Sequence, residues 1–152
     1  LLFGWFRKMD KLTVNVISAT GLRNADRGSN LSDPYVTIWV GSRNVAQTQV
    51  VKDNLNPFFH FVLPVALTGE CPEGTRIRFE IRDKDLIGSS YLGEVSVPFA
   101  DVKKAGPAGW KGQKIVKSTM PKVEVSGTLN VGLLLEPMTT EKCKKTVDLS
   151  KV

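Results

Sequence analysis

The chain has 152 residues, of which 41% are hydrophobic and 24% charged, and its formal net charge at pH 7 is +6. A chain of this length forms one domain and buries roughly two-thirds of its unfolded surface. No apolar run approaches the eighteen or so residues that span a bilayer, which excludes a transmembrane helix. The two cysteines, Cys71 and Cys143, form no CxxC or Cys/His cluster, which excludes a zinc site of the usual spacing and indicates reduced thiols in a cytosolic setting.

Alternating apolar residues predict an all-β chain of eight short strands. The segment "RIRFEIR", for example, places Ile77, Phe79 and Ile81 on one face and charged residues on the other. Thirteen glycines and eight prolines divide the runs, and only "FADVKKAG" is compatible with a helical turn. The pattern predicts an eight-stranded antiparallel Greek-key β-sandwich with strands near 11–18, 35–40, 45–51, 58–63, 76–82, 92–97, 114–117 and 128–135.

Strand parity brings distant carboxylates together in this prediction. If successive strands run antiparallel, the connections after the first, third and fifth strands emerge at the same end of the sandwich. Asp26 and Asp33 lie in the first of these connections, and Asp83 and Asp85 open the last. Unit charges 4 Å apart repel by roughly 4 kcal/mol at a surface-like dielectric, so four carboxylates at one end favour a bound cation. Oxygen ligands on irregular loops are typical of Ca²⁺.

Two other interpretations of these residues fit poorly. The spacing from Asp83 to Glu94 partly matches an EF-hand loop, but strand patterns flank it where helices are required. His60 is a lone histidine in the aromatic strand "FFHF", and no GxSxG motif, P-loop or Cys/His dyad accompanies the aspartates. The sequence therefore predicts that the chain is not an enzyme, and net charge alone does not indicate nucleic-acid binding.

The motifs in chain order resemble the C2 domain family. "LTVNVISATGL", "LSDPYVTIWV", "NLNPFFHF", "IRFEIRDKD" and "YLGEVSVP" follow one another over about residues 10–136. The late strand "GTLNVGLLL" and the immediate first strand "KLTVNV" resemble the circularly permuted, phospholipase-type topology. The expected organisation is a flank over 1–9 from a larger protein, a C2 domain over 10–136 and a charged tail or linker over 137–152.

The resemblance implies that aspartates of the first and third loops bind Ca²⁺. Asp26 and Asp33 correspond to the first-loop positions, and Asp83 and Asp85 to the third-loop pair. Ser90 stands where the family usually has a fifth aspartate, which removes one charged ligand of the outer ion site. Asp26 and Asp33 are seven residues apart, one more than in the common pattern, which affects the position of Asp26. The backbone carbonyls of Ala25 and Lys84 are expected as neutral ligands.

The resemblance also implies that Ca²⁺ bridges the domain to anionic phospholipid, for which we expect a phosphatidylserine-like membrane. Leu86 and Ile87 follow the aspartate pair at the expected loop tip, where they suit lipid insertion, and Arg27 and Arg82 suit contact with headgroups. The expected location is cytoplasmic and peripheral to the membrane. The alternative is a calcium-independent C2 module that binds a protein or lipid partner.

Overall fold

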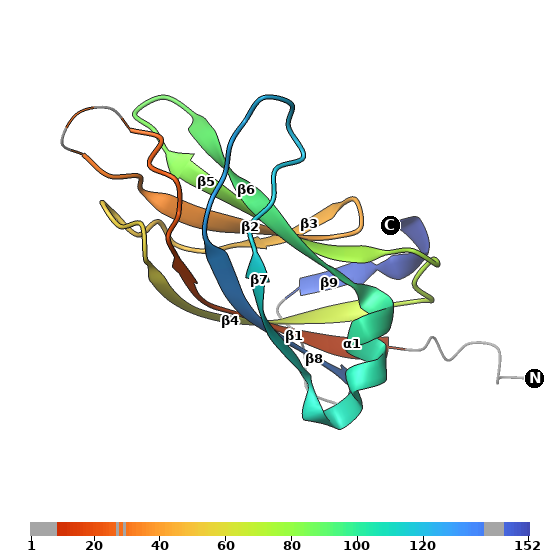
Figure 1. Ribbon diagram of the computed structural model, residues 1–152. Coiled ribbons are helices and arrows are strands. Elements are labelled where there is room, and N and C mark those ends of the chain that lie inside the picture. The colour runs from red at the N-terminus through yellow and green to blue at the C-terminus, as the bar shows by residue number, and fades with distance from the viewer. Residues whose placement is uncertain (1–8, 27, 29, 139–144) are drawn as a thin grey trace, which may run out of the picture.

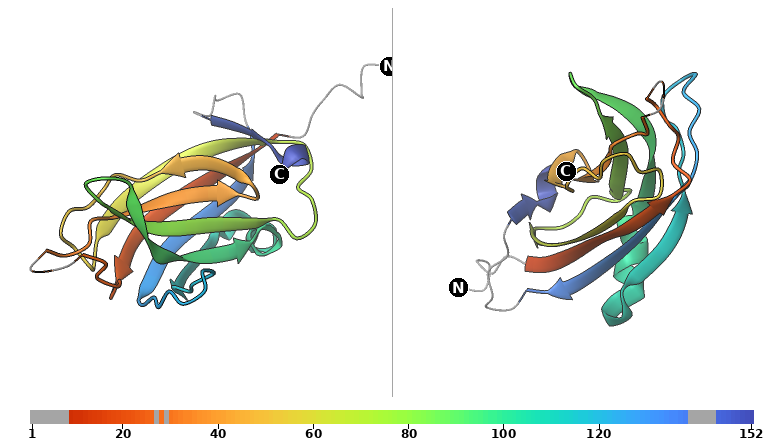
Figure 2. Two further views of the ribbon diagram at one scale, coloured as in Figure 1. Left: turned by 90° about the horizontal axis from the view of Figure 1, so that it is seen from above. Right: turned by 90° about the vertical axis from the view of Figure 1, so that its left-hand side faces the viewer.

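The computed structural model describes residues 9–26, 28, 30–138 and 145–152. Within these residues nine strands form two facing sheets (Figures 1 and 2). The first sheet has the order β7 (Trp110–Ile115), β8 (Thr128–Pro137), β1 (Met9–Thr20), β4 (Phe58–Thr68) and β9 (Lys145–Asp148). The second has the order β3 (Arg43–Gln47), β2 (Pro34–Val40), β5 (Arg76–Lys84) and β6 (Ser89–Pro98).

The core lies between the sheets and follows the alternation of the sequence. The side chains of Ile77, Phe79 and Ile81 on β5 are fully buried, which confirms the face predicted for this strand. The facing sheet contributes Leu12, Val14 and Val16 of β1, which are also fully buried. Because side chains of a strand alternate between its two faces, one face of each sheet is apolar and the other faces solvent. The fold class predicted from the sequence is confirmed.

The strand β1 lies in the middle of its sheet and not at an edge. It pairs antiparallel with β4 on one side and with β8 on the other, where the register joins Asp10 to Pro137 and Thr20 to Thr128. The first and eighth strands of the chain are thus neighbours. A register shift between Val16 and Ser18 interrupts both pairings and bends β1 near the loops that carry the candidate site.

Two regions of the chain, residues 99–115 and 145–152, differ from the sequence-based expectation or refine it. The strand β7 begins at Trp110, ahead of the expected 114–117, and helix α1 (Phe99–Ala105) forms at the one segment where a helical turn was expected; a 3-10 turn, η2 (Gly106–Ala108), follows it. Residues 145–152, expected as a charged tail or linker, form β9 and a second 3-10 turn, η3 (Leu149–Lys151). The strand β9 pairs in parallel with β4, and Val147 and Leu149 are buried. The sandwich therefore extends to the last residues.

Four connections emerge at one end of the sandwich, as strand parity requires. They join β1 to β2 (residues 21–33), β3 to β4 (48–57), β5 to β6 (85–88) and β7 to β8 (116–127). In Figure 1 they occupy the left and upper sides, whereas α1 lies at the lower right. Gly93 of β6 allows the start of the β7–β8 connection to pack closely against β6. Its φ is 120°, and a Cβ there would collide with Val116.

Candidate metal centre

Three carboxylates meet at this end of the sandwich, two from connections and one from the end of a strand. Asp26 belongs to the β1–β2 connection, Asp83 lies at the end of β5, and Asp85 opens the β5–β6 turn. One carboxylate oxygen from each residue lies within 4.8 Å of the others. Three negative charges this close repel one another unless a proton or a cation is present.

Asp83 is the buried member of this group, and its side chain has no solvent exposure. Its Oδ1 accepts a hydrogen bond of 2.7 Å from the backbone N–H of Asp33, while its Oδ2 is buried without a hydrogen-bond partner. Burial, together with the charges of Asp26 and Asp85, raises the pKa of Asp83 to about 6, although the hydrogen bond from the Asp33 N–H lowers it. A buried carboxylate oxygen that lacks a donor, beside two other carboxylates, fits a cation ligand. Oxygen donors alone suit Ca²⁺ better than a transition metal.

Asp33, in the β1–β2 connection, is bonded to the end of β5 and to the β3–β4 connection, and its carboxylate is not part of the close group. Besides the bond from its N–H to Asp83, its backbone carbonyl accepts from the N–H of Lys84 at 2.9 Å. Its Oδ1 accepts from the backbone N–H of Asp53 at 2.7 Å, in the β3–β4 connection. Asp33 therefore holds its own connection to the end of β5 and to the β3–β4 connection.

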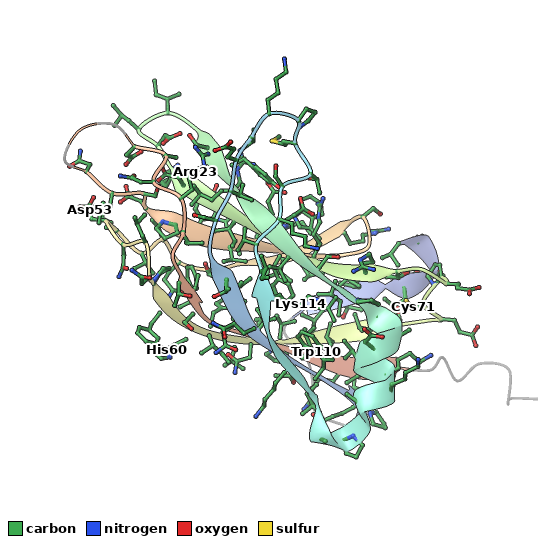
Figure 3. All side chains as sticks on the ribbon, viewed as in Figure 1. Arg23, Asp53, His60, Cys71, Trp110 and Lys114 are labelled. Carbon is green, nitrogen blue, oxygen red and sulfur yellow. The ribbon has the colours of Figure 1, made fainter. Side chains whose placement is uncertain are left out.

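Asp53 was not among the residues singled out from the sequence. Its backbone has a φ of 49°, in the left-handed region that aspartate tolerates better than most residues. Its Oδ1 accepts from the backbone N–H of Leu31 at 3.3 Å, so its carboxylate faces the β1–β2 connection. Figure 3 shows Asp53 at this end of the molecule, across the fold from Cys71. Strand parity was the signal available, since it also brings the connection after the third strand to this end.

The β5–β6 turn displays two apolar side chains. The N–H of Asp85 donates to the carbonyl of Gly88 at 3.1 Å, and Gly88 has a φ of 78°, which closes a tight turn. Leu86 and Ile87 lie between them with exposed fractions of 101% and 90%. They do not fold back on the loops. Ser90, after the turn, donates its hydroxyl to Asp85 Oδ2 at 2.6 Å and so orients that carboxylate.

Polar contacts within the β1–β2 connection position Asp26. Its N–H donates to Asn24 Oδ1 at 3.1 Å. Ser32, which is fully buried, accepts from the N–H of Ala25 at 2.8 Å and donates to the carbonyl of Arg23 at 3.2 Å. Ser32 was not predicted from the sequence either, because a serine in a polar loop carries no pattern that marks it as buried.

Of the two arginines expected at lipid headgroups, only Arg82 lies in the described part of the chain. Arg27 lies outside the described residues. The guanidinium of Arg82 is held within the protein, since Nη1 contacts Glu80 Oε1 at 2.6 Å and Nε donates to Ser89 Oγ at 2.7 Å. A lipid phosphate would therefore compete with Glu80 for Arg82.

The C2 domain model matches residues 10–112, which is more than half of the chain and includes all three carboxylates of the group. The chain belongs to the C2 domain family. Solved C2 domains share the fold: the first C2 domain of a plant extended synaptotagmin 1 superposes with a TM-score of 0.73 at 23% identity, covering 88% of this chain and 99% of that one. The calcium-bound pair of C2 domains of extended synaptotagmin 2 gives a TM-score of 0.69 at 24% identity, over 88% of this chain and 47% of that one.

Curated C2 relatives are longer than this chain. Phospholipase D gamma 3 of Arabidopsis thaliana is 35% identical over 69 residues, which are 44% of this chain and 7% of that protein. A calcium-dependent lipid-binding protein of the same plant is 32% identical over 93 residues, covering 61% of this chain and 18% of that protein. Extended synaptotagmin-1 of Rattus norvegicus is 33% identical over 100 residues, 62% of this chain and 9% of that protein. What is shared is the C2 domain and not the remainder of these proteins.

Away from these three carboxylates, the part of the chain that the structure describes has few other groups suited to chemistry. Among the described residues, the only cluster of acidic, histidine or cysteine side chains close enough to hold a metal is Asp26, Asp83 and Asp85. The ring of His60 is exposed and stacks on Phe58, with 5.4 Å between the ring centroids. No helix in the described part of the chain is long and apolar enough to span a membrane.

Proposed function

We propose that this C2 domain binds Ca²⁺ and then attaches to membranes rich in anionic phospholipid, of the phosphatidylserine type. In a larger parent protein it would recruit its neighbours to such a membrane. The observation that carries the proposal is the unpartnered, buried Oδ2 of Asp83 beside the carboxylates of Asp26 and Asp85.

The proposed ligands lie in the β1–β2 connection and around the β5–β6 turn. Asp26 and Asp33 belong to the former, and Asp83, at the end of β5, and Asp85, in the turn, belong to the latter. The backbone carbonyls of Ala25 and Lys84 add neutral oxygens, and Ser90 contributes either directly or by orienting Asp85. Four carboxylates carry the charge that two divalent ions would neutralise, and bound Ca²⁺ would supply positive charge with open positions for lipid phosphate oxygens.

The neighbourhood of the carboxylates supports attachment to lipid. Leu86 and Ile87 project from the turn that begins at Asp85, and no core contact accounts for them. Without a cation, three clustered carboxylates repel an anionic surface, so attachment would depend on Ca²⁺ even in a chain of net charge +6. One curated relative is described as a calcium-dependent lipid-binding protein, which agrees with this proposal.

Calorimetric titration with Ca²⁺, followed by co-sedimentation with phosphatidylserine–phosphatidylcholine vesicles, tests the proposal. The domain should release or absorb heat with Ca²⁺, and it should sediment in Ca²⁺ but not in chelator. Asp83→Asn with Asp85→Asn should abolish both signals while the domain stays folded, because ligands are lost and repulsion is relieved. The matched control is Glu70→Gln with Glu73→Gln, two exposed carboxylates in the β4–β5 connection. The proposal is wrong if the aspartate pair binds Ca²⁺ like the control.

A calcium-independent interaction module is the second candidate, and two contacts favour it. The carboxylate of Asp33 already accepts from Asp53, and the hydroxyl of Ser90 is already bound to Asp85. Vesicle binding that is equal in Ca²⁺ and in chelator, with no calorimetric signal, would select this candidate.

A further inference from the structure

The β7–β8 connection, residues 116–127, reaches the same side of the molecule as the β1–β2 connection and the β5–β6 turn, near which the candidate metal ligands lie. Figure 1 and the right-hand view of Figure 2 share a vertical axis. In both, this connection, the β5–β6 turn and the described part of the β1–β2 connection all extend to the upper edge of the molecule. A flat surface that touches the β5–β6 turn at this edge also meets the β7–β8 connection.

Hydrogen bonds fix this connection to β6, close behind the β5–β6 turn. Lys117 exchanges two backbone hydrogen bonds with Glu94, of 2.8 and 2.9 Å. The hydroxyl of Thr119 donates to Glu94 Oε1 at 2.9 Å, and its N–H donates to the Tyr91 hydroxyl at 3.3 Å. Glu94 and Tyr91 are themselves buried, so the connection is fastened to the rigid part of the sandwich.

The far end of the connection is fixed to the start of the β1–β2 connection. Ser126 Oγ donates to the carbonyl of Gly21 at 2.8 Å. A Cβ on Gly127 would collide with the carbonyl of Thr20 and would lie 2.8 Å from the carbonyl carbon of Gly21, so only glycine permits this approach. The connection is thus held to β6, which follows the β5–β6 turn, and to the start of the β1–β2 connection, which carries Asp26.

Its turn presents an apolar side chain beside a cation. Met120 is 46% exposed, and Pro121 and Lys122 after it are also exposed. Lys122 has a φ of 60°, a left-handed conformation that reverses the chain there. The hydroxyl of Ser118 accepts from the N–H of Met120 at 3.2 Å and donates to its carbonyl at 3.0 Å, which fixes the turn that displays Met120.

We propose that the turn 120–122 is a second membrane contact, in which Lys122 binds lipid phosphates and Met120 enters the headgroup region. The inference rests on the proposed function, since the metal loops bring this edge to the membrane. The chemistry of the turn favours an anionic lipid surface: a cation beside an apolar, unbranched side chain, on a fixed turn at the same edge as Leu86 and Ile87. Two contacts on different loops would fix how the domain is oriented on the bilayer.

A charge series at Lys122 tests the electrostatic part of the proposal. Asparagine and aspartate tolerate the left-handed backbone, so Lys122→Asn and Lys122→Asp change the charge without straining the turn. In Ca²⁺, affinity for phosphatidylserine–phosphatidylcholine vesicles should fall about fivefold for the first and about 25-fold for the second. The matched controls are Lys104→Gln and Lys104→Glu on α1, an exposed lysine at the opposite side of the molecule, which should change affinity less than about twofold.

Site-directed labelling tests insertion independently of affinity. In a background with Cys71→Ser and Cys143→Ser, an environment-sensitive dye attached at Met120→Cys should shift to the blue when vesicles and Ca²⁺ are added, and a dye at Lys104→Cys should not. The inference is overturned if the Lys122 series matches the Lys104 controls, or if the dye at position 120 reports only water. The inference and the proposed function fail together only if the unmodified domain does not bind vesicles in Ca²⁺. As a control, the Ca²⁺ affinity measured by calorimetry should be the same for all variants.

Discussion

At the scale of single residues, Asp33 combines two properties that mutation can separate. Its carboxylate accepts the Asp53 N–H, and it is also one of the proposed ligands. Asp33→Asn keeps an acceptor oxygen but loses the charge, whereas Asp33→Ala loses both. We expect both variants to bind Ca²⁺ at least about tenfold more weakly, as the loss of about 1.4 kcal/mol or more implies.

The stability of the metal-free protein distinguishes the two variants. Only Asp33→Ala should unfold more easily in chelator, by about 1 kcal/mol, because only it leaves the Asp53 N–H without its acceptor. Urea denaturation measures this difference. Equal stability of the two variants would mean that the bond between the connections contributes nothing.

Asp83 gives the metal-free domain a dependence on pH. Its pKa is raised to about 6, chiefly by burial, so the folded state holds this proton more tightly than the unfolded chain does. The stabilisation is complete below the unfolded pKa of about 3.9 and is lost as pH rises through about 6. In chelator, this residue should therefore make the domain about 1 kcal/mol more stable at pH 5 than at pH 7.

Asp83→Asn isolates that contribution from other titrating groups. The variant should lose the part of the pH dependence that Asp83 supplies, so the difference between parent and variant in urea denaturation should itself change between pH 5 and pH 7. A difference that is constant with pH would show that the carboxylate of Asp83 ionises as it does in water.

At the scale of elements, the β5–β6 turn should add a contribution to membrane binding that salt does not screen. Burial of Leu86 and Ile87 in the acyl boundary stabilises by roughly 1.5–3 kcal/mol for each side chain if it is fully desolvated. Replacing both with alanine should leave Ca²⁺ affinity in solution unchanged while vesicle binding becomes weaker and more sensitive to salt. Val62→Ala, at an exposed apolar residue on β4, is the control. Co-sedimentation equal to that of the parent at every salt concentration would assign these side chains no role at the membrane.

The strand β9 and the turn η3 should contribute to stability although they lie outside the expected domain. Leu149 is 2% exposed and belongs to the core, so Leu149→Ala should lower the free energy of unfolding by about 2 kcal/mol, toward the low end for a buried leucine. Lys151→Ala, at an exposed residue of the same turn, should change it by less than about 0.5 kcal/mol. If the two variants unfold alike, this segment is not part of the cooperative unit.

At the scale of the whole molecule, Ca²⁺ should raise the melting temperature of the domain. A ligand that binds only the folded state stabilises it by about 2.7 kcal/mol at a hundred times its dissociation constant. Thermal melts in chelator and in excess Ca²⁺ measure the shift, and Asp83→Asn with Asp85→Asn should remove it. Coincident melts of the unmodified domain in both buffers would favour the calcium-independent candidate.

Much of the fold was predictable because period-two alternation marks half-buried strands, as at Ile77, Phe79 and Ile81. The start of β7 was not, since "WKGQ" lacks that alternation. The indole ring of Trp110 packs over Gly112, where a Cβ would lie only 2.7 Å from the ring, so this position of the ring requires glycine. The strand β9 was missed because its four residues follow a run of lysines and pair only with the β4 edge.

The candidate site was predictable to the level of its loops but not of its contacts. Strand parity brought Asp26, Asp83 and Asp85 to one end, and the structure brings them within 4.8 Å. The bond from Asp53 to Asp33 depends on a left-handed backbone at Asp53 and on the register of two sheets, neither of which a local pattern records. The proposed Ca²⁺ ligation by Asp26, Asp33, Asp83 and Asp85 stays a prediction.

The pairing of β1 with β8 also constrains how the domain forms during synthesis. The central strand of the first sheet joins Asp10 to Pro137, so one whole side of β1 has no neighbour until more than a hundred further residues have been made. The chain between β1 and β8 must lose conformational entropy before the contacts between these strands can stabilise the fold, which slows folding. On the ribosome, β1 must therefore wait with the backbone N–H and C=O groups of one edge unpaired until β8 has left the exit tunnel, and in that interval the nascent chain is most open to chaperones and to misassembly through that edge.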